Sequence, residues 1–357
     1  MKRRASVFAA MWLVGLLLST AAHADGDVRL GPAPQLTKMP PSAVAPAGQI
    51  TAAPVAPIDT QSLGAVVAAY QNTYLPDQSV PAQWTGSVDG CVAGATSLAY
   101  EEATLRRINY YRAMSGLPGD VVFDSDQSVK CQDAALMMIA NGQLSHFPPP
   151  GWTCYTAAGA EAAGNSNLAL GAAGPAAVDL YMNDPGAGNE ILGHRRWILY
   201  PRQTAMGAGS VTAASGSFSG ANVLWVLGPF GTRPPAPEWV AWPPAGYVPY
   251  SLVFARWSFS YPSANFAGAT VEVTSGTTSL PVSIISATDV GYGDNTIAFV
   301  PANIPSRTTP PTANETYAVR IANVIVSGSP REFTYAVTRI DPSQPVRTQS
   351  ARWQFYF

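Results

Sequence analysis

Hydrophobic and polar residues follow two different patterns along the chain, and the change of pattern divides the sequence into two halves. In the first half, apolar residues recur at i, i+3, i+4 and i+7, which is the spacing of one helix face. Ser, Thr or Asp precedes several of these runs and Gly follows them, as is typical of helix starts and ends. The pattern predicts helices over residues 62–75, 96–116, 124–142 and 174–184.

The stretch NEILGHRRWIL at residues 189–199 predicts one more helix, which Pro201 ends. Residues 143–171 are rich in Gly, Pro and Asn, and we expect them to be mainly loop. Segments 204–211 and 221–231 are typical of strands. Helices followed by strands without strict alternation favour a mixed, layered domain.

After a proline-rich joint at residues 233–250, the sequence becomes β-like throughout. Short β-branched and aromatic runs are separated by Gly, Pro, Ser and Asn. This pattern, over roughly 100 residues, suits an immunoglobulin-like sandwich. We therefore expect an α+β chain with a mixed domain at residues 61–235, clearest at 96–231, and an all-β domain at residues 236–357.

The first 24 residues have the pattern of a secretory signal peptide. They combine a basic start, an apolar run too short to span a membrane, and the small-residue sequence AHA, which predicts cleavage after Ala24. No later segment is apolar enough over a sufficient length to predict a transmembrane helix. Residues 25–60 are rich in Pro and Ala without an apolar period, and we expect an extended linker. The protein is therefore expected to be secreted, either to a periplasm or to the extracellular space.

Composition supports export and argues against a nucleic-acid partner. Charged residues make up 12% of the chain, against a usual value of about 25%. The formal net charge is −2, and no basic run suggests binding to nucleic acid. The 31 glycines and 32 prolines indicate many turns.

The three cysteines predict one disulfide and one buried thiol. Cys91 and Cys154 both lie in loop-like sequence, and we expect them to pair. Cys131 lies on one face of the helix predicted at 124–142, together with other small or apolar residues, so we expect it to be a buried hydrophobic side chain. That face comprises Cys131, Ala134, Ala135 and Met138.

Removal of the signal peptide would leave two histidines, and acidic residues lie near both in the sequence. His146 follows the second predicted helix, and Glu161 lies fifteen positions further on. Asp184 ends the third helix, and Glu190 lies four positions before His194. If residues 189–199 are helical, Glu190 and His194 share one face, where the carboxylate would orient the imidazole.

Two histidines and a carboxylate would suit a divalent metal such as zinc, with His146 and His194 as ligands. The spacing ExxxH is weak evidence for such a site, because it is not a metalloprotease motif. The alternative for each histidine is a structural side chain with satisfied hydrogen bonds. The alternative for Arg195 and Arg196 is a solvated or salt-bridged helix end.

Five motifs in order resemble the CAP superfamily, which includes cysteine-rich secretory proteins, insect venom antigen 5, plant pathogenesis-related group-one proteins and bacterial SCP-like extracellular proteins. LRRINYYRAMSGLP is similar to the family's first helix, with Asn109, Arg112 and Gly116 in place. FDSDQSVKCQDAALMMIANGQLSH resembles the second helix, which ends in a histidine. AEAAGNSNL lies where the family has Gly-Glu-Asn, and VDLYMNDPG resembles the next helix. GHRRWILYPRQTAMGAG is similar to a Gly-His-Arg signature leading into a Gly-x-Gly strand.

The resemblance, over residues 105–209, implies an α-β-α sandwich with a groove lined by two histidines and two acids. Carried over to this chain, it implies that His146, His194 and Glu161 line the groove. The second acid is either Glu190 or Asp184, because AGNEIL is inserted before the second histidine. Ala162 stands at the position where the family has Asn after Glu, so we expect Asn165 or Asn167 to substitute for that asparagine. The joint and β-rich tail also resemble those of bacterial proteins with a CAP domain before an immunoglobulin-like domain.

Three functions remain open at this point. The first is a secreted binding module whose groove takes a metal or another ligand, such as a lipid or an envelope component, through His146 and His194. The second is a metal-dependent hydrolase acting on an envelope component, with Glu161 or Glu190 as general base. The third is a structural or adhesive envelope protein in which the β domain contacts the partner. The fold alone does not decide between them.

Overall fold

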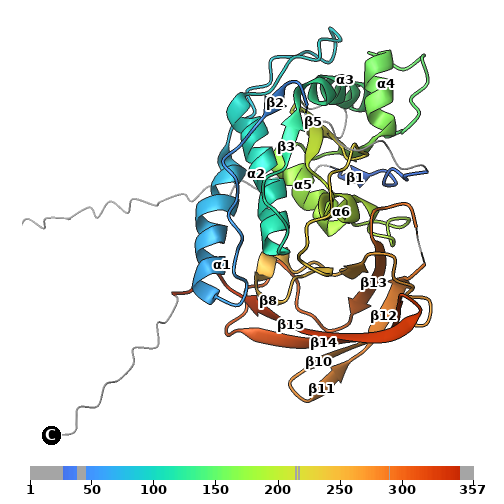
Figure 1. Cartoon of the computed structure of the whole chain (residues 1–357). Helices are drawn as coiled ribbons and strands as arrows, with labels where there is room; N and C mark the ends of the chain where they lie inside the picture. Colours follow the sequence, from blue (N-terminus) through green and yellow to red (C-terminus); the bar gives the residue numbers. More distant parts are fainter. Residues whose placement is uncertain (1–26, 38–45, 214, 216–217, 289, 346–357) are drawn as a thin grey trace, which may run out of the picture.

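The predicted helices of the first half form around one mixed sheet, as Figure 1 shows. The computed structural model describes residues 27–37, 46–213, 215, 218–288 and 290–345, so the expected signal peptide lies outside the described residues. The helices in the described residues are α1 Leu63–Ala69, α2 Leu98–Met114, α3 Ser125–Asn141, α4 Ala157–Gly164, α5 Gly174–Asn183 and α6 Gly193–Ile198, with a π-helical turn at Tyr70–Tyr74 and 3-10 turns at Pro76–Ser79 and Tyr250–Leu252. None of them combines the length and apolar character that a membrane-spanning helix needs.

The boundaries of α2 and α3 follow from the capping residues that the sequence supplies. The Ser97 hydroxyl accepts a hydrogen bond from the Tyr100 backbone N–H at 3.3 Å, and the Asp124 carboxylate accepts one from the Gln127 N–H at 3.0 Å. Gly142 ends α3 in the left-handed conformation, with φ of 58°. The helices predicted over 96–116 and 124–142 are therefore confirmed.

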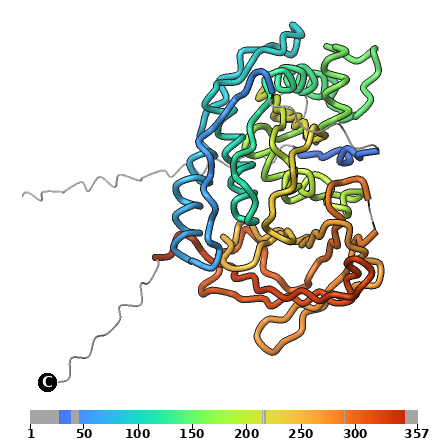
Figure 2. The backbone as a smooth tube through the Cα atoms, in the orientation of Figure 1, coloured from blue at the N-terminus to red at the C-terminus, as the bar shows by residue number. Residues whose placement is uncertain are grey.

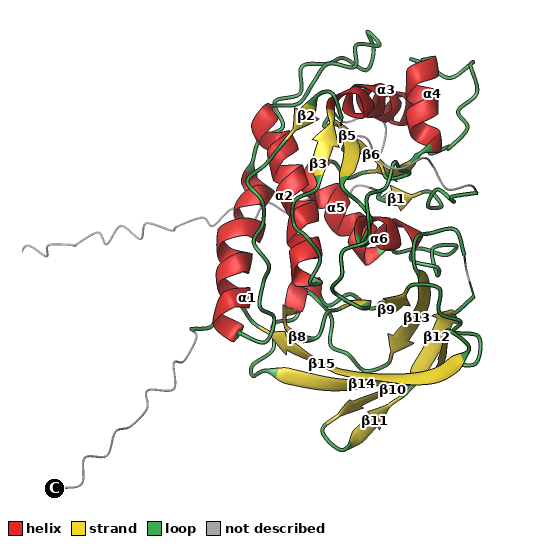
Figure 3. Cartoon of the chain, viewed as in Figure 1, coloured by secondary structure: helices red, strands yellow, loops and turns green. Residues whose placement is uncertain are grey.

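The central sheet has the strand order β1-β4-β6-β5-β3-β2 and separates two layers of helices (Figure 3). Its strands are β1 Arg29–Leu30, β2 Gln49–Ile50, β3 Val122–Asp124, β4 Ser166–Leu170, β5 Ala205–Val211 and β6 Ala221–Trp225. Along β4, Leu168 and Leu170 pack into the core formed with α3 and α4, whereas Ala169 packs into the core of α2, α5 and α6. The α-β-α sandwich implied by the resemblance is confirmed.

Two glycines allow α3 to approach β5 closely. A Cβ atom on Gly209 would lie 2.2 Å from the backbone nitrogen of Gln132, and one on Gly207 would lie 2.5 Å from the Cβ of Gln127. Both distances are far below van der Waals contact. The Gly-x-Gly strand is therefore required by the packing of the helix on the sheet.

Two segments of the first half differ from the prediction. Residues 143–171 were expected to be loop but include α4 and β4. The helix is built from Ala and Gly, which give little amphipathic signal, and β4 is buried on both faces, so its sequence does not alternate. The described part of the expected linker at 25–60 forms the two edge strands β1 and β2 of the central sheet.

The β-rich half forms two sheets, with strand orders β11-β10-β14-β15-β8 and β12-β13-β9-β7, and the all-β expectation is confirmed. Aromatic and β-branched residues of both sheets pack in one core, which gives a β-sandwich. The immunoglobulin-like topology stays a prediction. The strands are β7 Val240–Trp242, β8 Gly246–Pro249, β9 Trp257–Tyr261, β10 Thr270–Ser275, β11 Thr278–Leu280, β12 Val282–Ser286, β13 Asn295–Pro301, β14 Glu315–Val326 and β15 Ser329–Ile340.

The core of the β-sandwich is continuous with that of the first half. The proline-rich joint at 233–250 contains β7 and β8, and its Trp242 is fully buried. The ring of Trp242 packs against Tyr111 of α2, with centroids 5.0 Å apart. The joint therefore connects the two parts through packed side chains and does not separate them.

The cysteines are arranged as the sequence predicts. Cys91 and Cys154 form a disulfide that closes a loop of 63 residues, and Cys131 is a buried free thiol in α3. Burial raises the pKa of the Cys131 thiol to about 12. A thiol with this pKa is protonated at neutral pH and is a poor nucleophile.

We expect the Cys91→Ser/Cys154→Ser double variant to lose about 4 kcal/mol of unfolding free energy, because the disulfide restricts the unfolded chain over a long loop. Urea denaturation followed by circular dichroism measures this change. Cys131→Ala is the matched control, since it removes a cysteine and keeps the disulfide. A loss no larger in the double variant than in the control would contradict this role.

Candidate functional site

The candidate site is centred on α6, which starts later than the sequence predicts. The residues before it adopt left-handed backbone conformations that no helix contains, with φ of 97° at Gly186, 89° at Gly188 and 55° at Leu192. The helix therefore begins at Gly193, and the prediction of a helix from residue 189 is wrong. As a result, Glu190 and His194 do not share a helix face.

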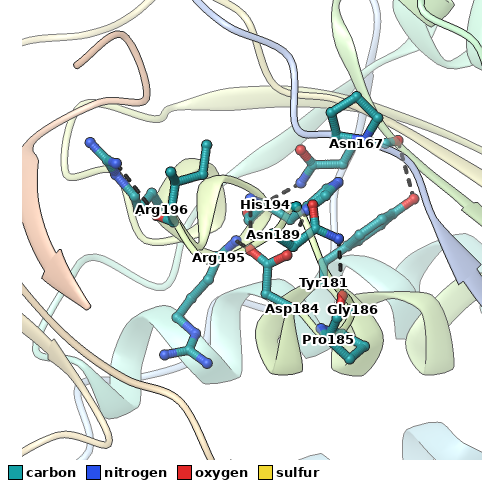
Figure 4. Close-up of polar contacts among 12 residues, drawn as sticks. Asn167, Tyr181, Asp184, Pro185, Gly186, Asn189, His194, Arg195 and Arg196 are labelled. Atoms are coloured by element: carbon teal, nitrogen blue, oxygen red, sulfur yellow. Dashed lines mark hydrogen bonds and ion pairs between the residues drawn. The ribbon is translucent and has the colours of Figure 1, made fainter. Parts of the chain in front are cut away.

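Asp184 is the acid that contacts His194. Its Oδ1 atom lies 2.8 Å from the His194 Nδ1 atom, and its Oδ2 atom accepts hydrogen bonds from the backbone N–H groups of His194 and Arg195, at 3.1 and 3.4 Å. The same carboxylate thus caps α6 and orients the imidazole (Figure 4). Asp184 is itself the residue that ends α5, and its left-handed backbone conformation turns its side chain toward α6.

Glu190 lies outside this cluster. Its carboxylate accepts a hydrogen bond from the Gly188 N–H at 2.9 Å and lies 3.9 Å from the Arg256 guanidinium, with 43% of the side chain exposed. Of the two acids that the sequence left open beside His194, the structure brings Asp184 to the ring and leaves Glu190 at the surface.

The His194 ring is fully buried and fixed on two sides. It stacks on Tyr181, with ring centroids 5.7 Å apart, while its Nδ1 atom is held by Asp184. The Asn167 amide donates to the His194 carbonyl at 3.2 Å. The His194 Nε2 and Asn167 Oδ1 atoms are buried and have no hydrogen-bond partner among the described residues. If Nδ1 donates its proton to Asp184, Nε2 carries a lone pair and acts as an acceptor.

His146 lies between two backbone carbonyls. Its Nδ1 atom is 2.6 Å from the Ala163 oxygen, and its Nε2 atom is 2.7 Å from the Pro32 oxygen. A neutral imidazole has one N–H group and donates to one carbonyl at a time, so only the protonated ring donates to both. In this arrangement both ring nitrogens of His146 face backbone carbonyls. Neither nitrogen is directed at a metal ion that His194 could also bind.

Glu161 contacts a lysine through its carboxylate, which forms no hydrogen bond or ion pair with His146 or His194. Its carboxylate forms an ion pair of 2.8 Å with Lys130 of α3, and 52% of its side chain is exposed. The Asn165 amide donates to the Glu161 backbone oxygen at 2.9 Å, whereas Asn167 contacts His194. Of the two asparagines expected to substitute for the family's Asn, Asn167 is the one that contacts His194.

The donor set does not fit a metal ion. Within the described ranges, no group of three or more His, Cys, Asp or Glu side chains is arranged to hold one. His146 is bonded to carbonyls, Glu161 is paired with Lys130, and the Asp184 carboxylate is directed at His194 Nδ1 and at backbone N–H groups. The expected zinc site therefore stays a prediction that this geometry does not favour.

Arg195 and Arg196 are buried and do not form a solvated helix end. Arg195 donates to the carbonyls of Met182 and Arg256, at 2.7 and 2.9 Å, and burial lowers its pKa to about 10. Arg196 donates to the Asp294 carbonyl at 3.0 Å. Both side chains join α6 to the β-rich half.

The N-terminal segment 27–37, which we call the strap, lies against the same helix. The Trp197 indole of α6 donates to the Pro34 carbonyl at 2.8 Å, and Ala33 packs on Gly193, where an added Cβ would lie 2.5 Å from the Ala33 Cβ. Figure 2 shows the dark blue strap on the opposite side of the molecule from the blue segment that leads to α1. This contact could not be predicted from the sequence, because the strap has no apolar period.

Comparison with known families identifies this architecture. Residues 105–228 match the model of the Cysteine-rich secretory protein family, the CAP family. This part of the chain is a CAP domain, which confirms the resemblance seen in residues 105–209. Among characterised proteins, no sequence matches the chain at a significant level.

We expect Asp184→Asn to lower the unfolding free energy by about 2 kcal/mol. Asparagine tolerates the left-handed backbone conformation, but its amide has only one acceptor oxygen. The aspartate uses one oxygen for the backbone N–H groups of α6 and the other for the imidazole, so the NH₂ group of asparagine would face a donor on one of these two sides. Guanidinium denaturation measures the loss. Glu190→Gln is the matched control, and we expect it to change stability by less than about 0.5 kcal/mol because the side chain is exposed. Equal losses in both variants would show that Asp184 does not organise the site.

Proposed function

We propose that this protein is a secreted binding module, built on a CAP domain, whose groove holds its ligand by hydrogen bonds. The residues that we assign to this groove are His146, Asn167, Gly193, His194 and Trp197, which lie around the strap contacts of α6 and β4. The observation that carries the proposal is that two ring nitrogens contact backbone carbonyls of one extended chain segment. His146 Nε2 lies 2.7 Å from the Pro32 oxygen, and Trp197 Nε1 donates to the Pro34 oxygen at 2.8 Å. Such an arrangement binds a ligand and supplies no reacting group.

The described residues do not favour the hydrolase. Neither Glu161 nor Glu190 approaches His194, so no free carboxylate is placed as a general base beside it. The Cys131 thiol is buried in α3 with a raised pKa, so it does not suit nucleophilic catalysis. Binding therefore explains the groove better than catalysis.

Export is supported by three observations of different kinds. The sequence of residues 1–24 has the pattern of a signal peptide. Cys91 and Cys154 form a disulfide, and disulfides persist in oxidising environments outside the cytosol. The matched family is that of cysteine-rich secretory proteins.

Isothermal titration with zinc tests the proposal against a metal centre. We expect wild type and the His146→Ala/His194→Ala double variant to give the same heats, because the His146 nitrogens are bonded to carbonyls and no three-ligand group is formed. His146→Ala alone is the second variant, since its ring is partly exposed and its loss leaves the buried His194 in place. Zinc binding that is present in wild type and lost in either variant would identify a metal centre and overturn the proposal.

A further inference from the structure

We infer that the ligand of this groove is an extended peptide with a small residue between two prolines, and that the strap is its resident, exchangeable occupant. The inference rests on the proposed function and names the class of ligand. It is argued from the backbone pairing, the carbonyl contacts and the steric fit of the strap.

The strap first extends the central sheet by one strand. Arg29 and Leu30 of β1 pair antiparallel with Leu170 and Ala169 of β4, whose other side pairs with β6. Main-chain pairing of this kind adds a peptide to a sheet edge without regard to most of its side chains. The edge of β4 is therefore a site for an extended chain.

The strap then leaves the sheet and is held by its carbonyls. The Pro32 oxygen lies 2.7 Å from His146 Nε2, and the Pro34 oxygen accepts from Trp197 Nε1 at 2.8 Å. Proline has no N–H group, so at these two residues the carbonyl is the only polar backbone group to satisfy. With its proton on Nε2, or with both nitrogens protonated, His146 joins Trp197 as a second ring donor, and the two donors match two carbonyl acceptors on a proline-containing peptide.

Steric fit selects the residue between the two prolines. Ala33 is 6% exposed and packs on Gly193, where the absence of a Cβ makes room for it. A Cβ on Gly193 would also lie 3.0 Å from the Tyr292 ring. Beyond this point the Leu36 N–H donates to the Gly291 carbonyl at 2.8 Å, so the peptide ends against a loop of the β-rich half.

The strap has the properties of an occupant that can leave. Only Ala33 and Pro34 are buried among its eleven residues, and its ladder is two residues long. In the secreted form proposed above, it is tethered at one end, through residues 38–45.

A cleavable version of the full chain tests the inference. A sequence for a site-specific protease is inserted between Pro40 and Pro41, and the folded protein is cut after purification. The probe is a fluorescein-labelled peptide of residues 27–37, DVRLGPAPQLT, followed by fluorescence anisotropy. We expect saturable binding to the cut protein and at least about tenfold weaker binding to the uncut protein, in which the tethered strap competes.

Matched variants locate the binding. In the peptide, Ala33→Leu should weaken binding at least about tenfold, and Val28→Leu should not, because Val28 is 49% exposed. In the protein, His146→Ala and Gly193→Ala should weaken binding by a similar factor. Gly268→Ala is the control, because a Cβ there meets open space. Circular dichroism of each cut variant establishes that it is folded.

Absence of peptide binding to folded, cut protein, or equal binding of the Ala33→Leu peptide, would overturn the inference. That result would leave the proposed function in place if zinc still gave equal heats with wild type and the histidine variants. The same peptide chemistry could come from the chain's own strap or from that of a second copy. Size-exclusion chromatography of the uncut protein separates these two sources. A monomer shows that the bound strap belongs to the same chain. A dimer that dissociates on cutting and peptide addition shows that it belongs to a second copy.

Discussion

The structure depends on the burial of polar and charged side chains in one short helix. The six residues of α6 include His194, Arg195 and Arg196, all buried. Burying such groups is costly unless each is hydrogen-bonded or paired. The Asp184 carboxylate satisfies the helix start and the imidazole, while carbonyls of α5 and the β-rich half accept from Arg195. Arg112 of α2 donates to carbonyls at the helix end, at Ile198 and Tyr200. The position of α6 thus ties together parts of the chain far apart in sequence.

The surroundings of α6 are accordingly shared between the CAP domain and segments outside it. The family match covers residues 105–228, whereas the strap precedes it and the loop around Gly291 follows it. Trp197 and Gly193 present one face of α6 to the strap, and Arg196 donates to the Asp294 carbonyl near that loop. The proposed binding site therefore depends as much on the flanking segments as on the CAP domain.

Local signals in the sequence predicted a large part of the fold. Ser97 and Asp124 cap helices whose starts were predicted from Ser, Thr or Asp residues before an apolar run. The Cys91–Cys154 pairing was predicted from loop-like context. The sandwich itself came from the resemblance to the CAP family. The limits of α6 could not be predicted, because they depend on a left-handed loop and on a carboxylate ten residues away.

The candidate site was predicted only in part, for the same reason. Asp184 and Glu190 were equally placed by sequence, and only the fold shows that Asp184 reaches His194 while Glu190 reaches Gly188. Glu161 was taken from a family motif, but Lys130 on the neighbouring helix draws its carboxylate outward. The strap has no periodicity, since main-chain contacts and one small side chain hold it.

The disulfide has a further consequence when the chain meets a protease. Phe147, with 88% of its surface exposed, lies in a loop between Cys91 and Cys154. Exposed loop tips of this kind are where proteases most readily nick a folded chain. A cut beside Phe147 would divide the polypeptide, yet the two fragments would remain covalently joined through the disulfide. The molecule can therefore lose the continuity of its backbone in this exposed loop and still remain one covalent particle.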